Sequence, residues 1–173
     1  AAAERSDATM KAILKKGGWT VEWRMTAAMN DAYRATIDAN IQLIKSIPAQ
    51  YLTQVQGSVM RSVQTGRDVG GLAKELRDHF GVTKRRAAFI AHSQNNLASS
   101  TLTKVRMAES GITHALWVHS HAGRIPRPSH LANDGNEYEI EKGWYDPDAK
   151  VWTWPGCLPN CRCVARPIVN ALR

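Results

Sequence analysis

Apolar residues recur at steps of three and four through residues 30–110, which is the spacing of one face of an α-helix. The pattern predicts helices over residues 30–47, 51–64, 69–80 and 84–110. Pro48 is expected to end the first helix, because proline cannot donate a backbone hydrogen bond. Asp68 and Thr83 can cap the third and fourth helices, and Gly81 stands where a left-handed C-terminal residue is favoured. We therefore expect a helical region over the first two thirds of the chain.

The first 29 residues lack this clear helical spacing. Trp19, Val21 and Trp23 alternate after Lys15–Gly18, a run typical of a hinge or turn. We expect an arm here, with Trp19 and Trp23 as anchors in a neighbouring subunit, because tryptophan is enriched among the residues that dominate interfaces.

Beyond residue 111 the period shortens to two, which is typical of strands. It predicts strands over residues 113–119, 138–140, 151–154 and 161–169, separated by turns rich in proline, aspartate and glycine. Pro167 points to an edge position for the last strand. We therefore predict an α+β fold. Residues 1–82 form a helical region with the arm, and residues 83–173 form a long helix plus a small mixed sheet.

Charge is unevenly distributed along the 173 residues, of which 43% are apolar. The net charge is +8, and residues 1–110 carry 16 Lys/Arg against 9 Asp/Glu, or +7. Such a field favours nucleic acid or an acidic protein surface as a partner, and a solvated helical surface is the alternative. No signal peptide and no bilayer-spanning apolar run is visible, so we expect a soluble protein without a membrane partner.

Histidines and cysteines gather in the C-terminal third, with all three cysteines inside residues 157–163. The candidate metal ligands are His119, His121, His130, Cys161 and Cys163. The first two histidines and the last two cysteines are each two residues apart, so adjacent strands would bring four donors to tetrahedral zinc distances, with His130 able to replace His121. A structural zinc would stabilise a small sheet, although no cofactor is required. A disulfide that uses Cys157 and plain thiols remain open.

Five short pieces follow one another in a fixed order. They are Trp117-Val118-His119-Ser120, Pro126-Arg127-Pro128-Ser129-His130, Asp134-Gly135, Trp154-Pro155-Gly156 and Asn160-Cys161-Arg162-Cys163. With the preceding helix, this series resembles the minor head proteins of tailed phages of the Mu F type over about residues 83–169. Two features depart from the resemblance. Relatives often carry Ala-Arg-Asp/Thr-Glu/Gln where this chain has Ala91-His92-Ser93-Gln94, and Cys157 is an addition that makes a poor candidate ligand.

The resemblance implies a minor capsid protein that acts in phage head assembly and is not an enzyme. It would reside in the virion, and in the host cytoplasm during assembly. Its implied partners are the portal protein, the major capsid protein at the inner shell and packaged double-stranded DNA.

The remaining motif residues carry expected structural roles. These residues are Trp117, Arg127, Asp134, Gly135, Pro155, Gly156 and Arg162. The guanidinium groups of the two arginines are expected to hold the turns together near Asp134 or Glu137, with phosphate binding as the alternative. The basic run Lys84-Arg85-Arg86 is a candidate contact for DNA or an acidic portal surface, or else a solvated helix end.

Two other classes of function remain as alternatives. A metal-dependent nuclease or hydrolase would need an open metal position and a base, parts that His121, His130 and Asp134 can fill. A closed set of cysteine and histidine ligands leaves no such position, so we expect no enzyme. A basic DNA-binding module would contact phosphates and be sensitive to salt, because aromatic residues that stack on bases are scarce in the helical region.

Overall fold

The structure is a computed structural model that describes residues 26–41, 44–65, 67–121 and 125–169. The helices are α2 (Ala27–Ile41), the 3-10 turn η1 (Ala49–Tyr51), α3 (Leu52–Gln64), α4 (Val69–Phe80), α5 (Lys84–Glu109) and α6 (Pro128–Ala132). The strands are β1 (His114–Val118), β2 (Glu137–Glu139), β3 (Trp144–Asp146), β4 (Val151–Thr153) and β5 (Val164–Pro167). The predicted α+β class is confirmed. The expected arm lies in residues outside the described ranges, apart from the start of α2.

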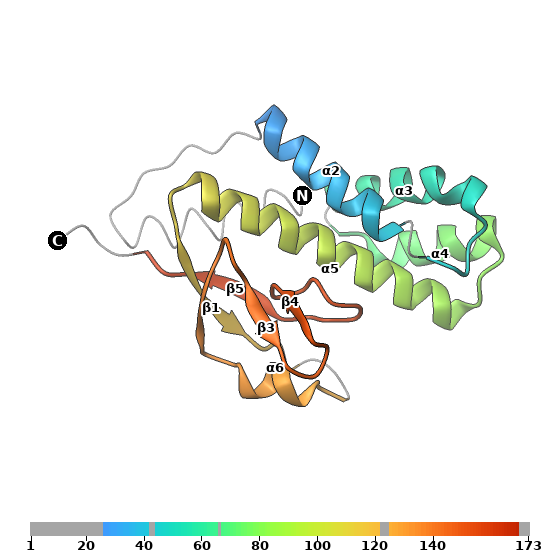
Figure 1. Cartoon of the computed structure of the whole chain (residues 1–173). Helices are drawn as coiled ribbons and strands as arrows, with labels where there is room; N and C mark the ends of the chain where they lie inside the picture. The colour runs from blue at the N-terminus through green and yellow to red at the C-terminus, as the bar shows by residue number, and fades with distance from the viewer. Residues whose placement is uncertain (1–25, 42–43, 66, 122–124, 170–173) are drawn as a thin grey trace.

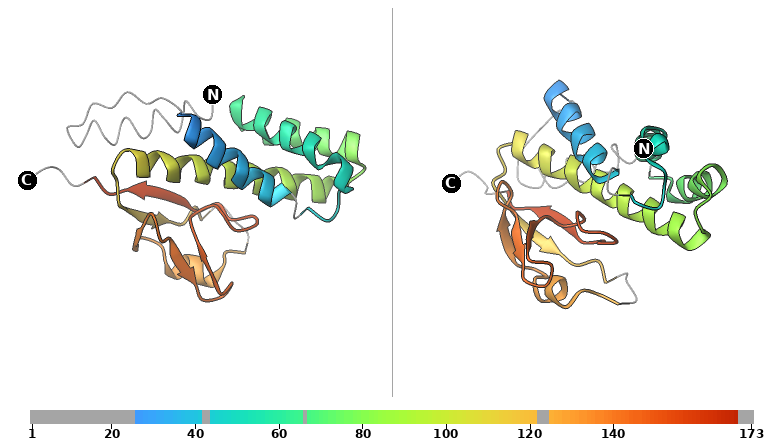
Figure 2. Two further views of the ribbon diagram at one scale, coloured as in Figure 1. Left: turned by 45° about the horizontal axis from the view of Figure 1, so that its top comes forward. Right: turned by 45° about the vertical axis from the view of Figure 1, so that its right-hand side comes forward.

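The 26-residue helix α5 runs between the two halves of the molecule (Figure 1). Helices α2 and α3 lie on one side of it, and the strands lie on the opposite side (Figure 2). As predicted, Thr83 caps α5 by accepting a hydrogen bond from the Arg86 backbone N–H, and Gly111 follows its end with φ 70°. One long helix therefore serves as the common wall of both halves.

The helical half has an apolar core built from α2, α3, α4 and the first part of α5. Val55, Val59 and Leu76 are fully buried in it, at positions that the helical period predicts. The predicted caps of α4 are also present, because Asp68 accepts from the Gly71 N–H and Gly81 is left-handed.

The helix predicted over residues 30–47 is wrong at its C-terminal end, since α2 ends at Ile41. The Ile44 N–H bonds to the Ile41 carbonyl, a three-residue turn in place of a helical step. Ile44 and Ile47 still reach the core from this turn. Apolar spacing alone therefore did not locate the end of the helix.

The strands form two small sheets, not the single mixed sheet that the sequence predicted. One sheet has the order β2-β1-β5, and the other pairs β3 with β4; all three pairings are antiparallel. Pro167 lies in β5 at a sheet edge, as predicted. The last strand begins at Val164 and not at Cys161, and both β3 and α6 escaped prediction.

A second core lies beneath the sheets and is centred on the fully buried Trp117 of β1. Its indole contacts the rings of Tyr138 and Trp144, with centroids 6.2 Å and 5.0 Å away. Met107 of α5 joins this core, whereas Leu102, one turn earlier, belongs to the first. The long helix thus contributes to both cores. The predicted boundary between residues 82 and 83 lies just before this helix, so the helix belongs to the second predicted region and also packs in the core of the first. Among the described residues, no helix has the length and apolarity that a bilayer crossing requires.

Candidate metal centre

His130, Cys161 and Cys163 meet in the second core. The Sγ atoms of Cys161 and Cys163 lie 3.4 Å and 3.6 Å from Nδ1 of His130. All donor atoms of the three residues lie within 4.8 Å of one another. The three residues are only 2%, 3% and 5% exposed in the same order, so the cluster is closed to solvent. Within the described residues, these three side chains form the one group of histidine, cysteine or acidic residues whose donor atoms lie close enough to share a metal ion.

Strand pairing brings the cysteines to this position. β1 pairs with β5, and the last register pair joins Val118 to Val164, immediately after Cys163. The segment before β5 is held against α5, because the Asn96 side chain donates to the Cys161 carbonyl at 2.7 Å and the Asn160 N–H donates to Ser93 Oγ at 2.9 Å. The cysteines therefore lie on a fixed turn that precedes the strand.

His130 reaches the sulfurs from the short helix α6, which begins at Pro128. Proline suits the first helical position, because the N–H that it lacks would have no intrahelical partner there. On the other side of the ring, His130 Nε2 lies 3.1 Å from Oδ2 of Asp146, which is fully buried. The second oxygen of Asp146 accepts from the backbone N–H groups of Asp148 and Ala149 at 2.9 Å and 3.3 Å. The carboxylate is thereby fixed in place, and it orients the imidazole.

The protonation of the cluster is coupled. The hydrogen bond from the Cys163 thiol lowers the pKa of Cys161, and the same bond raises the pKa of Cys163. Burial lowers the pKa of His130, but the hydrogen bond and charge of Cys161 and those of Asp146 outweigh it, so the net pKa is raised. Burial raises the pKa of Asp146, and the hydrogen bonds that its carboxylate accepts outweigh this effect. The arrangement thus favours one thiolate beside the imidazole.

His119 and His121, which the sequence also put forward as ligands, lie apart from this cluster. Their rings pack edge to face at 4.6 Å, and the His121 N–H donates to His119 Nδ1. Asp134 binds both residues, through the His119 backbone N–H at 2.8 Å and His121 Nε2 at 3.2 Å. The two-residue spacing correctly indicated a shared surface, but their partner is a carboxylate.

The motif glycines have conformational reasons. Gly135 has φ 80°, and its N–H donates to the Trp117 carbonyl, which attaches the turn between α6 and β2 to β1. Gly156 has φ 86°, and a side chain there would come within 3.1 Å of Ser100 Cβ on α5. Both positions favour glycine. The preceding Pro155 is buried, and its carbonyl accepts from the Ser100 hydroxyl.

Of the two motif arginines, Arg127 has a different partner from the acidic residues that the sequence suggested. Arg127 donates to the Pro159 carbonyl at 2.9 Å and so ties the proline-rich turn to the cysteine segment, not to Asp134 or Glu137. Arg162 is exposed near His92, whose pKa is lowered first by burial and then by the charges of Arg162 and Arg67. Arg127 thus has the expected role of tying turns together, with a different partner.

The three residues of the basic run at the start of α5 differ in their exposure and contacts. Lys84 and Arg85 are exposed, whereas Arg86 donates to Ser46 Oγ at 2.9 Å and lies over the Phe89 ring at 5.3 Å. Two of the three predicted contact residues thus present their charge to solvent.

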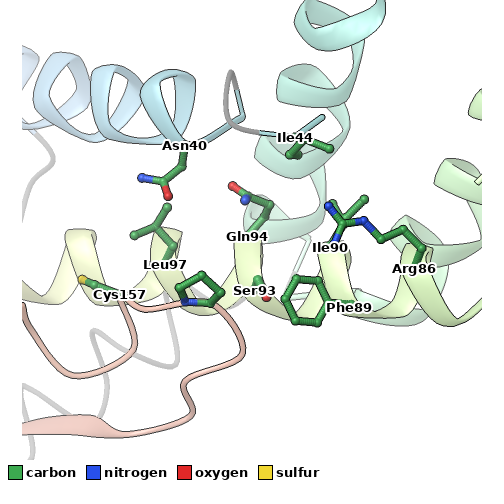
Figure 3. A pocket seen from close by; sticks show the side chains of 10 residues that line it. Asn40, Ile44, Arg86, Phe89, Ile90, Ser93, Gln94, Leu97 and Cys157 are labelled. Atoms are coloured by element: carbon green, nitrogen blue, oxygen red, sulfur yellow. The ribbon is translucent and has the colours of Figure 1, made fainter. Parts of the chain in front are cut away.

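Cys157 is separate from the other two cysteines in its surroundings. Its Sγ lies 3.3 Å from Ser100 Oγ and borders a pocket of about 270 Å³ between α2, α5 and the segment around Pro159 (Figure 3). Burial raises the pKa of its thiol. All three cysteines are free, so the disulfide alternative is not formed in this structure.

The chemistry open to the cluster is limited by its burial. Cys161, His130 and Asp146 have the connectivity of a nucleophile, a base and an orienting acid. A substrate carbonyl would have to reach the sulfur of Cys161, a residue that is only 3% exposed. The same three donors suit a soft divalent cation held inside the fold.

Asp146 is the site residue that sequence reasoning missed. It lies in Asp146-Pro147-Asp148, one of the proline- and aspartate-containing turns that the sequence predicts between strands, and the structure does turn there. A turn aspartate gives no sign of burial by itself. The available signal was its place directly before proline, at the end of an aromatic run that could form a strand facing the core.

Comparisons with known proteins agree with the motif order. The family described as Phage Mu protein F like protein matches residues 53–166. The chain is 36% identical over 147 residues to an uncharacterized protein of Haemophilus influenzae, and the match covers 85% of this chain. It spans about a third of the length of that relative, 32%. No solved structure matches the chain. Since the family match covers more than half of its residues, the chain belongs to the Phage Mu protein F like family, a family of phage head morphogenesis.

Proposed function

We propose that the chain is a minor head protein of a tailed phage, present in the virion, that serves assembly by binding other head components. The observation that carries the proposal is the closure of the motif unit. Trp117, His130, Cys161 and Cys163, which come from three of the five pieces of the family series, are buried in one core, and the Trp117 and His130 rings pack on each other. A unit closed in this way suits shape and attachment better than turnover.

The β3–β4 hairpin supplies the best surface for attachment to a portal or capsid protein. Tyr145 and Trp152 stand directly opposite in register, and their rings pack at 5.7 Å while 45% and 50% exposed. Lys142 lies 4.9 Å over the Trp152 ring. An exposed aromatic pair with a cation at its rim has the composition of a protein-binding hot spot.

Packaged DNA is the second partner that the proposal includes. The exposed Lys84 and Arg85 at the start of α5 offer charge to phosphates, in the more basic part of the chain. Phosphate contacts give affinity without sequence preference. This surface lies on the first turn of α5, whereas the aromatic pair belongs to the hairpin in the C-terminal unit.

Complementation of a phage that lacks the gene tests the proposal. We expect the deletion to reduce the yield of filled heads and the wild-type chain to restore it. Trp152→Ala should lower incorporation into heads about tenfold or more, as loss of a hot-spot residue does. Leu131→Ala is the matched control, because Leu131 is also a large apolar residue, 43% exposed, on α6 of the same unit. A normal yield of filled heads from the deletion phage would refute the proposal.

A further inference from the structure

We propose that His130 Nδ1, Cys161 Sγ and Cys163 Sγ bind one zinc ion. This inference goes beyond the proposed function and does not depend on it. Zinc needs both cysteines as thiolates and His130 as a neutral imidazole, so the two protons that the three groups hold between them leave to solvent as the Zn–S and Zn–N bonds form.

The distances fit a tetrahedral zinc ion. Zinc binds cysteine sulfur at about 2.3 Å and histidine nitrogen at about 2.0–2.1 Å, which places nitrogen and sulfur about 3.6 Å apart at the tetrahedral angle. The two nitrogen–sulfur distances in the structure are 3.4 Å and 3.6 Å. Both nitrogen–sulfur distances thus match a tetrahedral zinc site, and the two sulfurs lie within 4.8 Å of each other.

The chemistry of the donors selects a soft or borderline cation. Two sulfurs and one imidazole suit zinc, whereas magnesium and calcium require oxygen ligands. The Cys163 thiol, and then His130 and the backbone N–H groups of Cys163 and Gly156, lower the pKa of Cys161, because each stabilises negative charge on its sulfur. Metal binding needs this charge.

The surroundings of His130 supply the second layer of a metal site. Its Nε2 faces Asp146 at 3.1 Å, which directs the lone pair of Nδ1 toward the two sulfurs. A carboxylate that binds the outer nitrogen of a ligand histidine is a recurring feature of zinc sites. Burying an aspartate beside a histidine costs desolvation free energy, and a cation bound to the histidine would offset part of that cost.

Native mass spectrometry of the full chain, purified under reducing conditions with zinc chloride, is the primary test. We expect one zinc per chain, lost on treatment with a chelator. Cobalt(II) in place of zinc should give thiolate-to-cobalt charge-transfer absorption and strong visible bands of a four-coordinate ion. Cys161→Ser and Cys163→Ser should each abolish that absorption. Cys157→Ser is the matched control and should retain one equivalent, because Cys157 lies on Ser100.

Two further measurements avoid variants that fail to fold. In the wild-type chain, alkylation mapped by mass spectrometry should reach Cys161 and Cys163 only after the chelator is added. Asp146→Asn should weaken zinc binding about 10–100-fold, as measured by competition with a chromophoric chelator. Glu139→Gln, which removes an exposed carboxylate of β2 outside the cluster, should leave zinc affinity unchanged.

The proposal is overturned if the wild-type chain binds no zinc or cobalt. Equal loss of metal in Cys157→Ser, retention of metal in both other cysteine variants, or alkylation of Cys161 and Cys163 that ignores the chelator would each overturn it too.

Discussion

The ring of Trp117 meets the ring of His130 edge to face, with centroids 5.0 Å apart. Trp117 comes from the first strand and His130 from a helix of a few residues that follows a proline-rich turn. Their contact joins the first two pieces of the family series in one core. The same indole contacts Tyr138 and Trp144. Trp117 is therefore the centre on which the C-terminal unit is packed.

Loss of this side chain should be costly. Trp117→Ala is expected to lower the free energy of unfolding by about 3–5 kcal/mol, the usual cost of deleting a buried aromatic ring. Urea denaturation followed by circular dichroism measures it. Trp152→Ala, a change of an exposed tryptophan, should cost about 0.5 kcal/mol or less. Similar losses in the two variants would contradict the assigned core.

Gly135 and Gly156 both need glycine for their positive φ, but only at Gly156 would a side chain also meet neighbouring atoms. Both have positive φ, which costs a side chain about 1–2 kcal/mol. A Cβ at Gly135 meets nothing within 4 Å, whereas at Gly156 it meets Ser100 and the Cys163 carbonyl at 3.1 Å and 3.3 Å. We therefore expect Gly156→Ala to lower the free energy of unfolding by more than Gly135→Ala. Equal losses in urea melts would show that the fit against α5 is loose.

Asp134 should make stability depend on acid pH. The His119 backbone N–H, and then His121, lower the pKa of this carboxyl below its ordinary value of 3.8. Its contribution to stability is therefore present above that ordinary value and is lost as pH falls through the folded-state pKa. Asp134→Asn should be less stable than wild type at neutral pH, with the difference shrinking below about pH 4. Thermal melts from neutral pH downward test this, and a constant difference would count against it.

Lys84 and Arg85 should contribute to the salt dependence of DNA binding. Each phosphate contact adds about 0.9 to the slope of log affinity against log salt, so the double Ala variant should lower the slope by about 2. Filter binding over a salt series measures it. Arg166→Ala, an exposed arginine of β5, should leave the slope unchanged. An unchanged slope in the double variant would remove this surface from the DNA contact.

Local periodicity predicted where the helices lie and how two of them are capped, but not where α2 ends. The caps at Asp68 and Thr83 and the left-handed Gly81 depend on a few neighbouring residues, so the sequence predicts them directly. The end of α2 at Ile41 depends on how the chain turns into α3, which apolar spacing does not encode. Tertiary packing decides such ends.

The candidate site shows the same division. The spacing of Cys161 and Cys163 predicted that both sulfurs could bind one metal ion if their segment lay beside the first strand. The pairing of β1 with β5 confirms that the segment lies beside β1. The sequence left His121 and His130 as alternatives for one ligand, and the structure decides between them, because Asp134 binds His121 whereas His130 meets the two sulfurs. That choice depends on α6, whose proline-rich sequence was interpreted as a turn. Asp146 escaped notice because its burial follows from the hairpin and not from its neighbours in sequence.

Quantitative mass spectrometry of purified, DNA-filled heads addresses the proposed role without reference to any single contact. We expect the chain to be present in them at a constant ratio to the major capsid protein, far below one copy per capsid subunit, and to resist washing with high salt. Heads that lack the chain while the infected-cell lysate contains it in abundance would contradict the account.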